Sequence, residues 1–109
     1  MEAELVLRRR EEFRTPGGVV IAIERDLFRL PVMEGAARMF PDDFRLSWIA
    51  FDTGRPSCRV LIDNHPPKGL HFHIDGEEAG VAITCSSLRE LKKFFRVKIN
   101  ERFGEYQGD

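Results

Sequence analysis

One stretch of this chain has the apolar spacing of a helix, and it lies near the C-terminal end. Its apolar residues recur at intervals of three or four and would form one face of a helix, namely Leu88, Leu91, Phe95, Ile99 and Phe103. Ser87 with Glu90 three residues later matches a capping box, and Gly104 is a typical residue at a helix end. We therefore expect one amphipathic helix over 87–103, which must pack its Phe-rich face on another element.

The residues before this helix alternate between apolar and polar side chains, as half-buried β-strands do. Strands are expected at 3–13, 19–23 with a continuation toward 30, 44–51, 58–62, 70–75 and 81–84. Turn residues separate them, for example Thr15-Pro16-Gly17-Gly18, while 32–43 reads as a loop. The pattern predicts an α+β fold: an antiparallel meander sheet of five to six strands with one C-terminal amphipathic helix packed on one face.

Length and charge narrow the possible functions. The chain has 109 residues, which suits a single domain over 1–109. Its 17 Lys and Arg against 18 Asp and Glu argue against a broadly basic nucleic-acid binder. Arg8, Arg9 and Arg10 form one short basic run, which we interpret as a solvated strand end.

Cysteine usage and hydropathy point to the cytoplasm. Cys58 and Cys85 are too few for a disulfide framework, and each lies beside an apolar run, so reduced buried thiols are expected. The N-terminal residues lack an apolar stretch of signal-peptide length, and no run approaches membrane-spanning length. We therefore expect a cytoplasmic protein without a membrane partner. An open sheet also leaves edge strands, so a homodimer is plausible, with Val19–Ile23 as the expected pairing edge.

The chemically suggestive residues gather in one polar hairpin, from Asp63 to Asp75. It holds every histidine of the chain and three short polar neighbours, namely His65, His71, His73, Asp63, Asn64 and Asp75. His71 and His73 are two apart on an expected strand and therefore project from the same face. Three interpretations of this group remain open.

The first interpretation is a divalent metal site. Imidazole and carboxylate groups are common ligands of such ions, and the candidate ligands are His65, His71, His73 and Asp75. A divalent metal is the one cofactor that the sequence suggests.

The second interpretation is acid–base catalysis without a metal, as in a ribonuclease. Histidine titrates near neutral pH, so His71 and His73 could exchange protons with a substrate. Lys68 could stabilise a phosphate oxyanion, and Asp63 and Asn64 complete the candidate catalytic set. In the third interpretation the histidines occupy the wet side of a strand, and Asp63 and Asn64 only cap the turn.

The hairpin also resembles a known signature. Its Asp63-Asn64-His65, Lys68-Gly69, His71-x-His73 and Gly76-Glu77-Glu78 are similar to the pattern of TumE-like toxins of toxin–antitoxin modules, and the resemblance extends over 44–103. Family members usually carry Arg between the two histidines, where this chain has Phe72. The resemblance implies a cytoplasmic toxin with a helix-turn-helix antitoxin as its partner. The toxin hypothesis adds a nuclease-like or other phosphate-directed activity at His71 and His73, for which RNA is a candidate substrate. A non-enzymatic binding domain that uses the open sheet face is the alternative.

Overall fold

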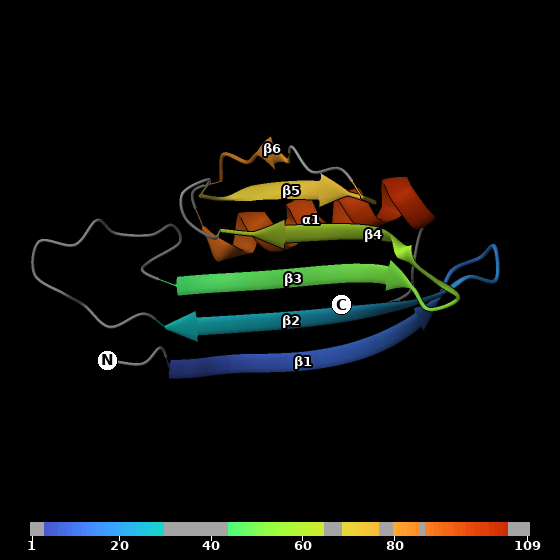
Figure 1. Cartoon of the computed structure of the whole chain (residues 1–109), viewed down its shortest axis with the longest axis horizontal. Helices are drawn as coiled ribbons and strands as arrows, with labels where there is room; N and C mark the ends of the chain where they lie inside the picture. Colours follow the sequence, from blue (N-terminus) through green and yellow to red (C-terminus); the bar gives the residue numbers. More distant parts are fainter. Residues whose placement is uncertain (1–3, 30–43, 65–68, 77–79, 86, 105–109) are drawn as a thin grey trace, which may run out of the picture.

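The structure is a computed structural model that describes residues 4–29, 44–64, 69–76, 80–85 and 87–104. Its elements, in chain order, are β1 (Glu4–Arg14), β2 (Val20–Arg29), β3 (Phe44–Asp52), β4 (Arg55–Asp63), β5 (His71–Ile74), β6 (Val81–Ala82) and α1 (Leu88–Phe103). The strands form one six-stranded sheet in the order β1-β2-β3-β4-β5-β6, with every neighbouring pair antiparallel (Figure 1). The predicted α+β meander with one C-terminal helix is confirmed.

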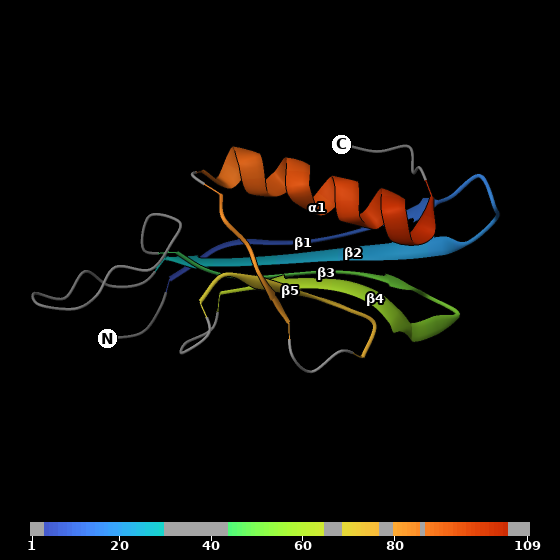
Figure 2. The ribbon, with the colours of Figure 1, turned by 90° about the horizontal axis from the view of Figure 1, so that it is seen from above.

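The helix lies along one face of this sheet (Figure 2). It begins where the sequence predicts, because the Ser87 hydroxyl accepts a hydrogen bond from the backbone N–H of Glu90 at 3.2 Å. It ends at Gly104, whose φ of 88° lies in the region that favours glycine and whose N–H bonds to the carbonyl of Asn100. Both caps satisfy backbone groups that a bare helix end would leave without partners.

The core fills the space between α1 and the sheet. Apolar side chains from one face of the strands meet the inner face of the helix, namely Ile21, Ile23, Leu27, Leu46, Trp48, Ala50, Val60, Ile62, Leu91, Phe95 and Ile99. Trp48 is 5% exposed and packs against Phe95, with ring centroids 5.8 Å apart. Each fully buried Val, Leu, Ile or Phe side chain of this set contributes about 1.5–3 kcal/mol by leaving water, so the helix is held by this face rather than by its own propensity.

The meander places β1 and β6 at the two edges of the sheet. The expectation that Val19–Ile23 forms a pairing edge is therefore wrong, since β2 is hydrogen-bonded on both sides, to β1 and to β3. In a meander only the first and last strands lack a second neighbour, and the first strand here is the hairpin partner of β2. The last strand is shorter than predicted, at Val81–Ala82. The predicted loop over 32–43 lies outside the described residues.

The remaining sequence expectations are met in part. The turn after β1 is confirmed, because the N–H of Gly18 bonds to the carbonyl of Thr15 at 2.9 Å. Cys58 and Cys85 are free thiols, but both are half-buried rather than buried. Burial, followed by the charge of Glu90, raises the pKa of the Cys85 thiol above its ordinary value. The helix of the described part is not long and apolar enough to cross a membrane.

Candidate functional site

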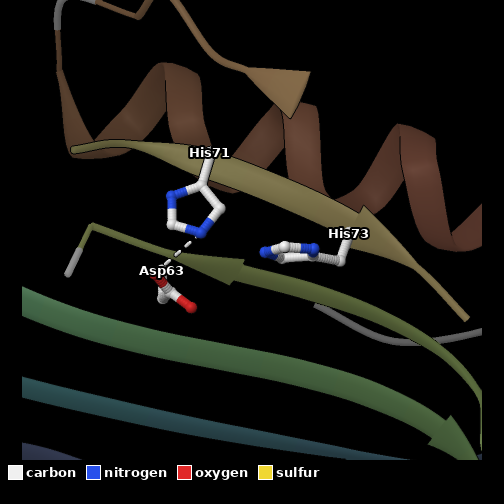
Figure 3. Close-up of side chains that lie close together, drawn as sticks. All are labelled: Asp63, His71 and His73. Atoms are coloured by element: carbon white, nitrogen blue, oxygen red, sulfur yellow. Dashed lines mark ion pairs between the residues drawn. The ribbon is translucent and has the colours of Figure 1, made fainter. Parts of the chain in front are cut away.

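Asp63, His71 and His73 come together on the β4–β5 pair. The strand register places Asp63 directly opposite His71, so their side chains project from the same face. Phe72, between the histidines, points to the other face, where its ring lies 5.3 Å from that of Phe94 on α1. The three polar side chains therefore lie on the sheet face opposite α1 (Figure 3).

His71 is held at both ring nitrogens. It is only 6% exposed. Its Nδ1 lies 2.6 Å from the carbonyl oxygen of Gly69, and its Nε2 lies 3.2 Å from Oδ1 of Asp63. Gly69 has a φ of 71°, a conformation that favours glycine and that lets the chain turn just before β5. The ring is thus fixed between a backbone oxygen and a carboxylate.

This geometry restricts the hydrogen-bond roles of the two nitrogens of His71. A carbonyl oxygen only accepts, so Nδ1 must carry the hydrogen that it donates to Gly69. A neutral ring would then direct the lone pair of Nε2 at the carboxylate of Asp63, which is also an acceptor. The contact is favourable when a proton or a metal cation lies between Nε2 and the carboxylate of Asp63. The pair therefore suits a shared proton or cation at this point.

His73 completes the group from two residues further along β5. Its ring is half-buried and meets the ring of His71 edge-on, with centroids 4.8 Å apart and an interplanar angle of 81°. Gly80 covers both rings from the connection to β6. A Cβ atom at Gly80 would lie 2.8 Å from Cε1 of His73 and 2.9 Å from Cδ2 of His71, so only glycine fits there without a shift.

The three side chains form a group that could hold a metal ion, with a spacing somewhat wider than a bound ion needs. Each offers one ligand atom, and these atoms all lie within 4.8 Å of one another. Two ligands of one tetrahedral zinc ion lie about 3.3 Å apart, given zinc–ligand distances near 2.0–2.1 Å. The 3.2 Å between His71 and Asp63 already suits a shared ion, and a shift of roughly 1.5 Å by the half-buried His73 ring would complete the set.

Asn64, a candidate catalytic residue by sequence, extends the sheet instead of facing the histidines. Its side chain is 1% exposed. The amide donates from Nδ2 to the carbonyl of Phe44 at 2.7 Å and accepts at Oδ1 from the N–H of Leu46 at 2.9 Å. The Asn64 side chain thereby takes the place of a backbone peptide next to β3 and continues the hydrogen-bond ladder past Asp63, where β4 ends. This is a structural role.

Asp75, a candidate metal ligand by sequence, is bound elsewhere. Its Oδ1 accepts hydrogen bonds from Nε of Arg102 and from the N–H of Arg59, both at 3.0 Å. The hydrogen bond from Arg102 is the main reason that the pKa of this carboxyl is below its ordinary value, although burial opposes it. The structure thus groups Asp63, not Asp75, with the strand histidines.

Two other candidates, His65 and Lys68, lie outside the described residues. Within the described part, the sequence-based set is therefore reduced to Asp63, His71 and His73. Sequence reasoning named Gly69 only as part of the Lys68-Gly69 pair of the resemblance and did not single out Gly80, although glycines that flank a histidine pair are a usable signal. The choice between Asp63 and Asp75 required the strand register, which the spacing of the hairpin alone does not determine.

Comparisons of this chain with protein-family models, with curated proteins and with solved structures found no match.

Proposed function

We propose that this protein binds a divalent transition metal ion, best suited to zinc, through Asp63, His71 and His73, and uses it to hydrolyse phosphate esters. One observation carries the proposal: His71 donates Nδ1–H to a backbone carbonyl and aims Nε2 at a carboxylate. Metal-bound histidines usually have this outer hydrogen bond, which fixes the ring tautomer and orientation. A bound ion would also supply the cation that suits this pair of acceptors.

The proposed ligand set is compatible with catalysis by the bound ion. Asp63, His71 and His73 would hold the ion through three ligands and would leave a position for water, as catalytic zinc sites do. Such an ion lowers the pKa of its bound water toward neutrality and withdraws charge from a phosphoryl oxygen. Two histidines and one carboxylate on neighbouring strands are also a rigid platform, because the strand ladder fixes their backbones.

Acid–base catalysis by two imidazoles is less well supported by this geometry. Both nitrogens of His71 already face oxygen atoms, so this ring would have to break a contact before it could exchange a proton with a substrate. His73 would then carry the proton transfers without a second imidazole. The metal interpretation keeps the hydrogen bond from His71 to Gly69, uses the Nε2 and Oδ1 atoms that already face each other, and requires only the shift of the His73 ring.

The biological role is proposed from the resemblance of the hairpin. The Asp63-Asn64 pair, Gly69 and the His71-x-His73 motif are similar to those of TumE-like toxins. We propose RNA as the phosphate-ester substrate, and a helix-turn-helix antitoxin as the partner that blocks the site in a cytoplasmic toxin–antitoxin module.

A non-enzymatic binding role has one observation in its favour. The sheet face opposite α1 carries apolar side chains from three strands, namely Phe28, Ile49, Phe51 and Leu61, and no described helix covers it. These side chains are only half-buried. A partner could use this face without any metal, and the experiment below separates the two roles.

Metal binding is tested with two matched carboxylate variants. Protein purified without an affinity tag should contain zinc or another transition metal at about one ion per chain by elemental analysis. Asp63→Asn should weaken zinc binding at least tenfold in a competition titration, because it replaces a proposed ligand. Asp75→Asn should leave the affinity unchanged, since that carboxylate is held by Arg102 and Arg59.

The toxin role is tested by growth with the same variants, at equal soluble protein levels. Expression of the wild type should slow bacterial growth and degrade RNA, Asp63→Asn should relieve both effects, and Asp75→Asn should not. Zinc binding without growth inhibition would leave the metal site standing and remove the toxin. Equal zinc content in wild type and Asp63→Asn would remove the metal site and leave the binding role.

A further inference from the structure

The longest unpaired edge in the described sheet belongs to β1. This strand pairs with β2 on one side only, whereas the opposite edge is the two-residue β6 (Figure 1). β1 runs for 11 residues, and its apolar Leu5, Val6 and Leu7 are 46%, 44% and 38% exposed. Such an edge presents a row of backbone N–H and C=O groups that can pair with another strand.

The sequence of β1 is complementary to itself in the antiparallel direction. In a dimer with a two-fold axis normal to the sheet, two residues that lie opposite each other project from the same face. Residues on one face are an even number of positions apart, so the axis must pass beside a residue and cannot pass between two neighbouring residues. With the axis beside Arg10, Arg9 lies opposite Glu11 of the second copy, and Arg8 lies opposite Glu12. Symmetry repeats each of these ion pairs, so opposite charges face each other on both sides of the central Arg10. Arg9 and Glu11 also pair within each chain, so the four side chains would form one alternating network.

The same register also joins apolar side chains at the ends of the pair. Leu7 lies opposite Phe13 of the second copy, which would cover an exposed leucine. The ladder to β2 is irregular between Leu5 and Leu7 and regular from Leu7 to Arg14. The paired segment, from Leu7 to Phe13, therefore falls entirely within the regular part of the strand.

The neighbouring two-fold registers place more like charges opposite each other. An axis beside Arg9 places Leu7 opposite Glu11 and Arg8 opposite Arg10, and an axis beside Glu11 places Arg8 opposite Arg14. The register beside Arg10 has one like-charge contact, between the two copies of Arg10 itself. Each of these guanidinium groups is already paired with Glu24 of its own chain and lies 5.7 Å from the ring centroid of Phe51, which offsets that repulsion.

From this complementarity we propose that two copies of the chain pair through β1, antiparallel, with the two-fold axis beside Arg10. The dimer forms one continuous sheet in which each β1 lies between its own β2 and the partner's β1. In the dimer the exposed carboxylate of Glu12 gains an ion pair with Arg8 of the second copy. Within its own chain, Nε of Arg8 also binds Oδ1 of Asp26 at 3.1 Å. This inference does not depend on the metal site, which lies on β4 and β5.

A charge-swap experiment tests both the dimer and its register. Wild-type protein should be dimeric by sedimentation at micromolar concentration. Glu12→Arg should raise the dimer dissociation constant at least tenfold, because it sets a second positive charge opposite each Arg8. Arg8→Glu should do the same, because it sets a second negative charge opposite each Glu12. An equimolar mixture of the two variants should dimerise again, since the substituted arginine and the substituted glutamate then lie opposite each other.

Arg14→Glu is the matched control. It reverses a charge on the same strand and the same face, yet Arg14 lies opposite Val6 in the proposed register, so the dissociation constant should change less than threefold. High salt should weaken the wild-type dimer, because exposed ion pairs are screened. A wild-type protein that stays monomeric overturns the proposal, and so does a dimer that survives both charge reversals.

Cross-linking gives a second measurement that does not rely on charge. In a Cys58→Ser, Cys85→Ser background, Arg10→Cys places two thiols opposite each other at the axis, where Cα atoms about 4.5–5.5 Å apart suit a disulfide. Glu12→Cys places its two copies about 14 Å apart, too far for a bridge. Oxidation by oxidised glutathione should link the first variant and not the second. Equal linking of both, or of neither, would refute the register.

Discussion

Two aspartates of the same hairpin show how the partner decides the role of a residue. Asp63 faces an imidazole whose other nitrogen is already used, so its carboxylate is left to share a proton or a cation with His71. Asp75 faces Arg102 and the backbone of Arg59, which balance its charge and keep it ionised. The two residues are chemically identical, and of the two only Asp63 lies in the group with His71 and His73 that could hold a metal ion.

Gly80 is the residue whose substitution should affect the site without removing a ligand. Its φ is 51°, and an added Cβ would meet the rings of His71 and His73 at 2.8–3.0 Å. Gly80→Ala should therefore lower the free energy of unfolding by roughly 2 kcal/mol, from the left-handed backbone and the crowding together. It should also weaken zinc binding several-fold. Denaturant unfolding and zinc titration measure the two effects.

Gly18→Ala separates the two contributions in that prediction. Gly18 also has a positive φ, of 86°, but no atom lies within 4 Å of an added Cβ. This variant should lose only the backbone part, about 1 kcal/mol, and should keep the zinc affinity of the wild type. If the two glycine variants behave alike in both measurements, Gly80 has no special relation to the histidines.

At the scale of elements, Asp75 joins the end of α1 to the turn after β5. Arg102, in the last turn of the helix, reaches the carboxylate, which also binds the N–H of Arg59 on β4. Asp75 has a φ of 57°, which aspartate tolerates better than most residues. One side chain thus links a helix, a strand and a turn that are distant in the sequence.

The Asp75–Arg102 pair should contribute a pH-dependent part of the stability. The pKa of Asp75 in the folded chain is below its ordinary value of 3.8, so folding favours the ionised form. Its contribution is fully present above that ordinary value and is lost as the pH falls through the lower folded value. The side chain is 44% exposed, so we expect less than about 1 kcal/mol at neutral pH.

The measurement compares wild type with Asp75→Asn by urea unfolding between pH 6 and pH 2. The difference between the two free energies of unfolding should be constant down to about pH 4 and should then shrink. Glu101→Gln, which removes the exposed pair with Lys98, is the control and should show a smaller difference. A difference that does not change with pH would mean that the Asp75 pKa is not lowered.

The elements were predictable because each has a local signature, whereas the contacts between them were not. Alternation identified the strands, and the cap at Ser87 identified the helix start. No local pattern, however, indicates that Asn64 would bond to Phe44 and Leu46, since this depends on the offset between β3 and β4. The pairing edge failed for the same reason: Val19–Ile23 has the composition of a strand, and composition does not reveal its neighbours.

At the scale of the whole molecule, the two faces of the sheet have separate tasks. The face under α1 holds the core and accounts for folding, while the opposite face carries the polar cluster of Asp63, His71 and His73. The ligands come from neighbouring strands, so an unfolded chain does not hold them in place. A metal that binds there should therefore stabilise the folded chain as a whole.

Thermal unfolding measures this coupling directly. Zinc at 100 times its dissociation constant should add about 2.7 kcal/mol to the free energy of unfolding, which raises the melting temperature by on the order of 10 °C for a chain of this size. Asp63→Asn should lose at least about half of this zinc-dependent shift at the same zinc concentration, because a tenfold or larger loss of affinity leaves the zinc at no more than about 10 times the dissociation constant of the variant. Asp75→Asn should keep the full zinc-dependent shift from a slightly lower starting point. A shift of equal size in Asp63→Asn would place the bound zinc elsewhere on the protein and contradict the site proposed at the β4–β5 pair.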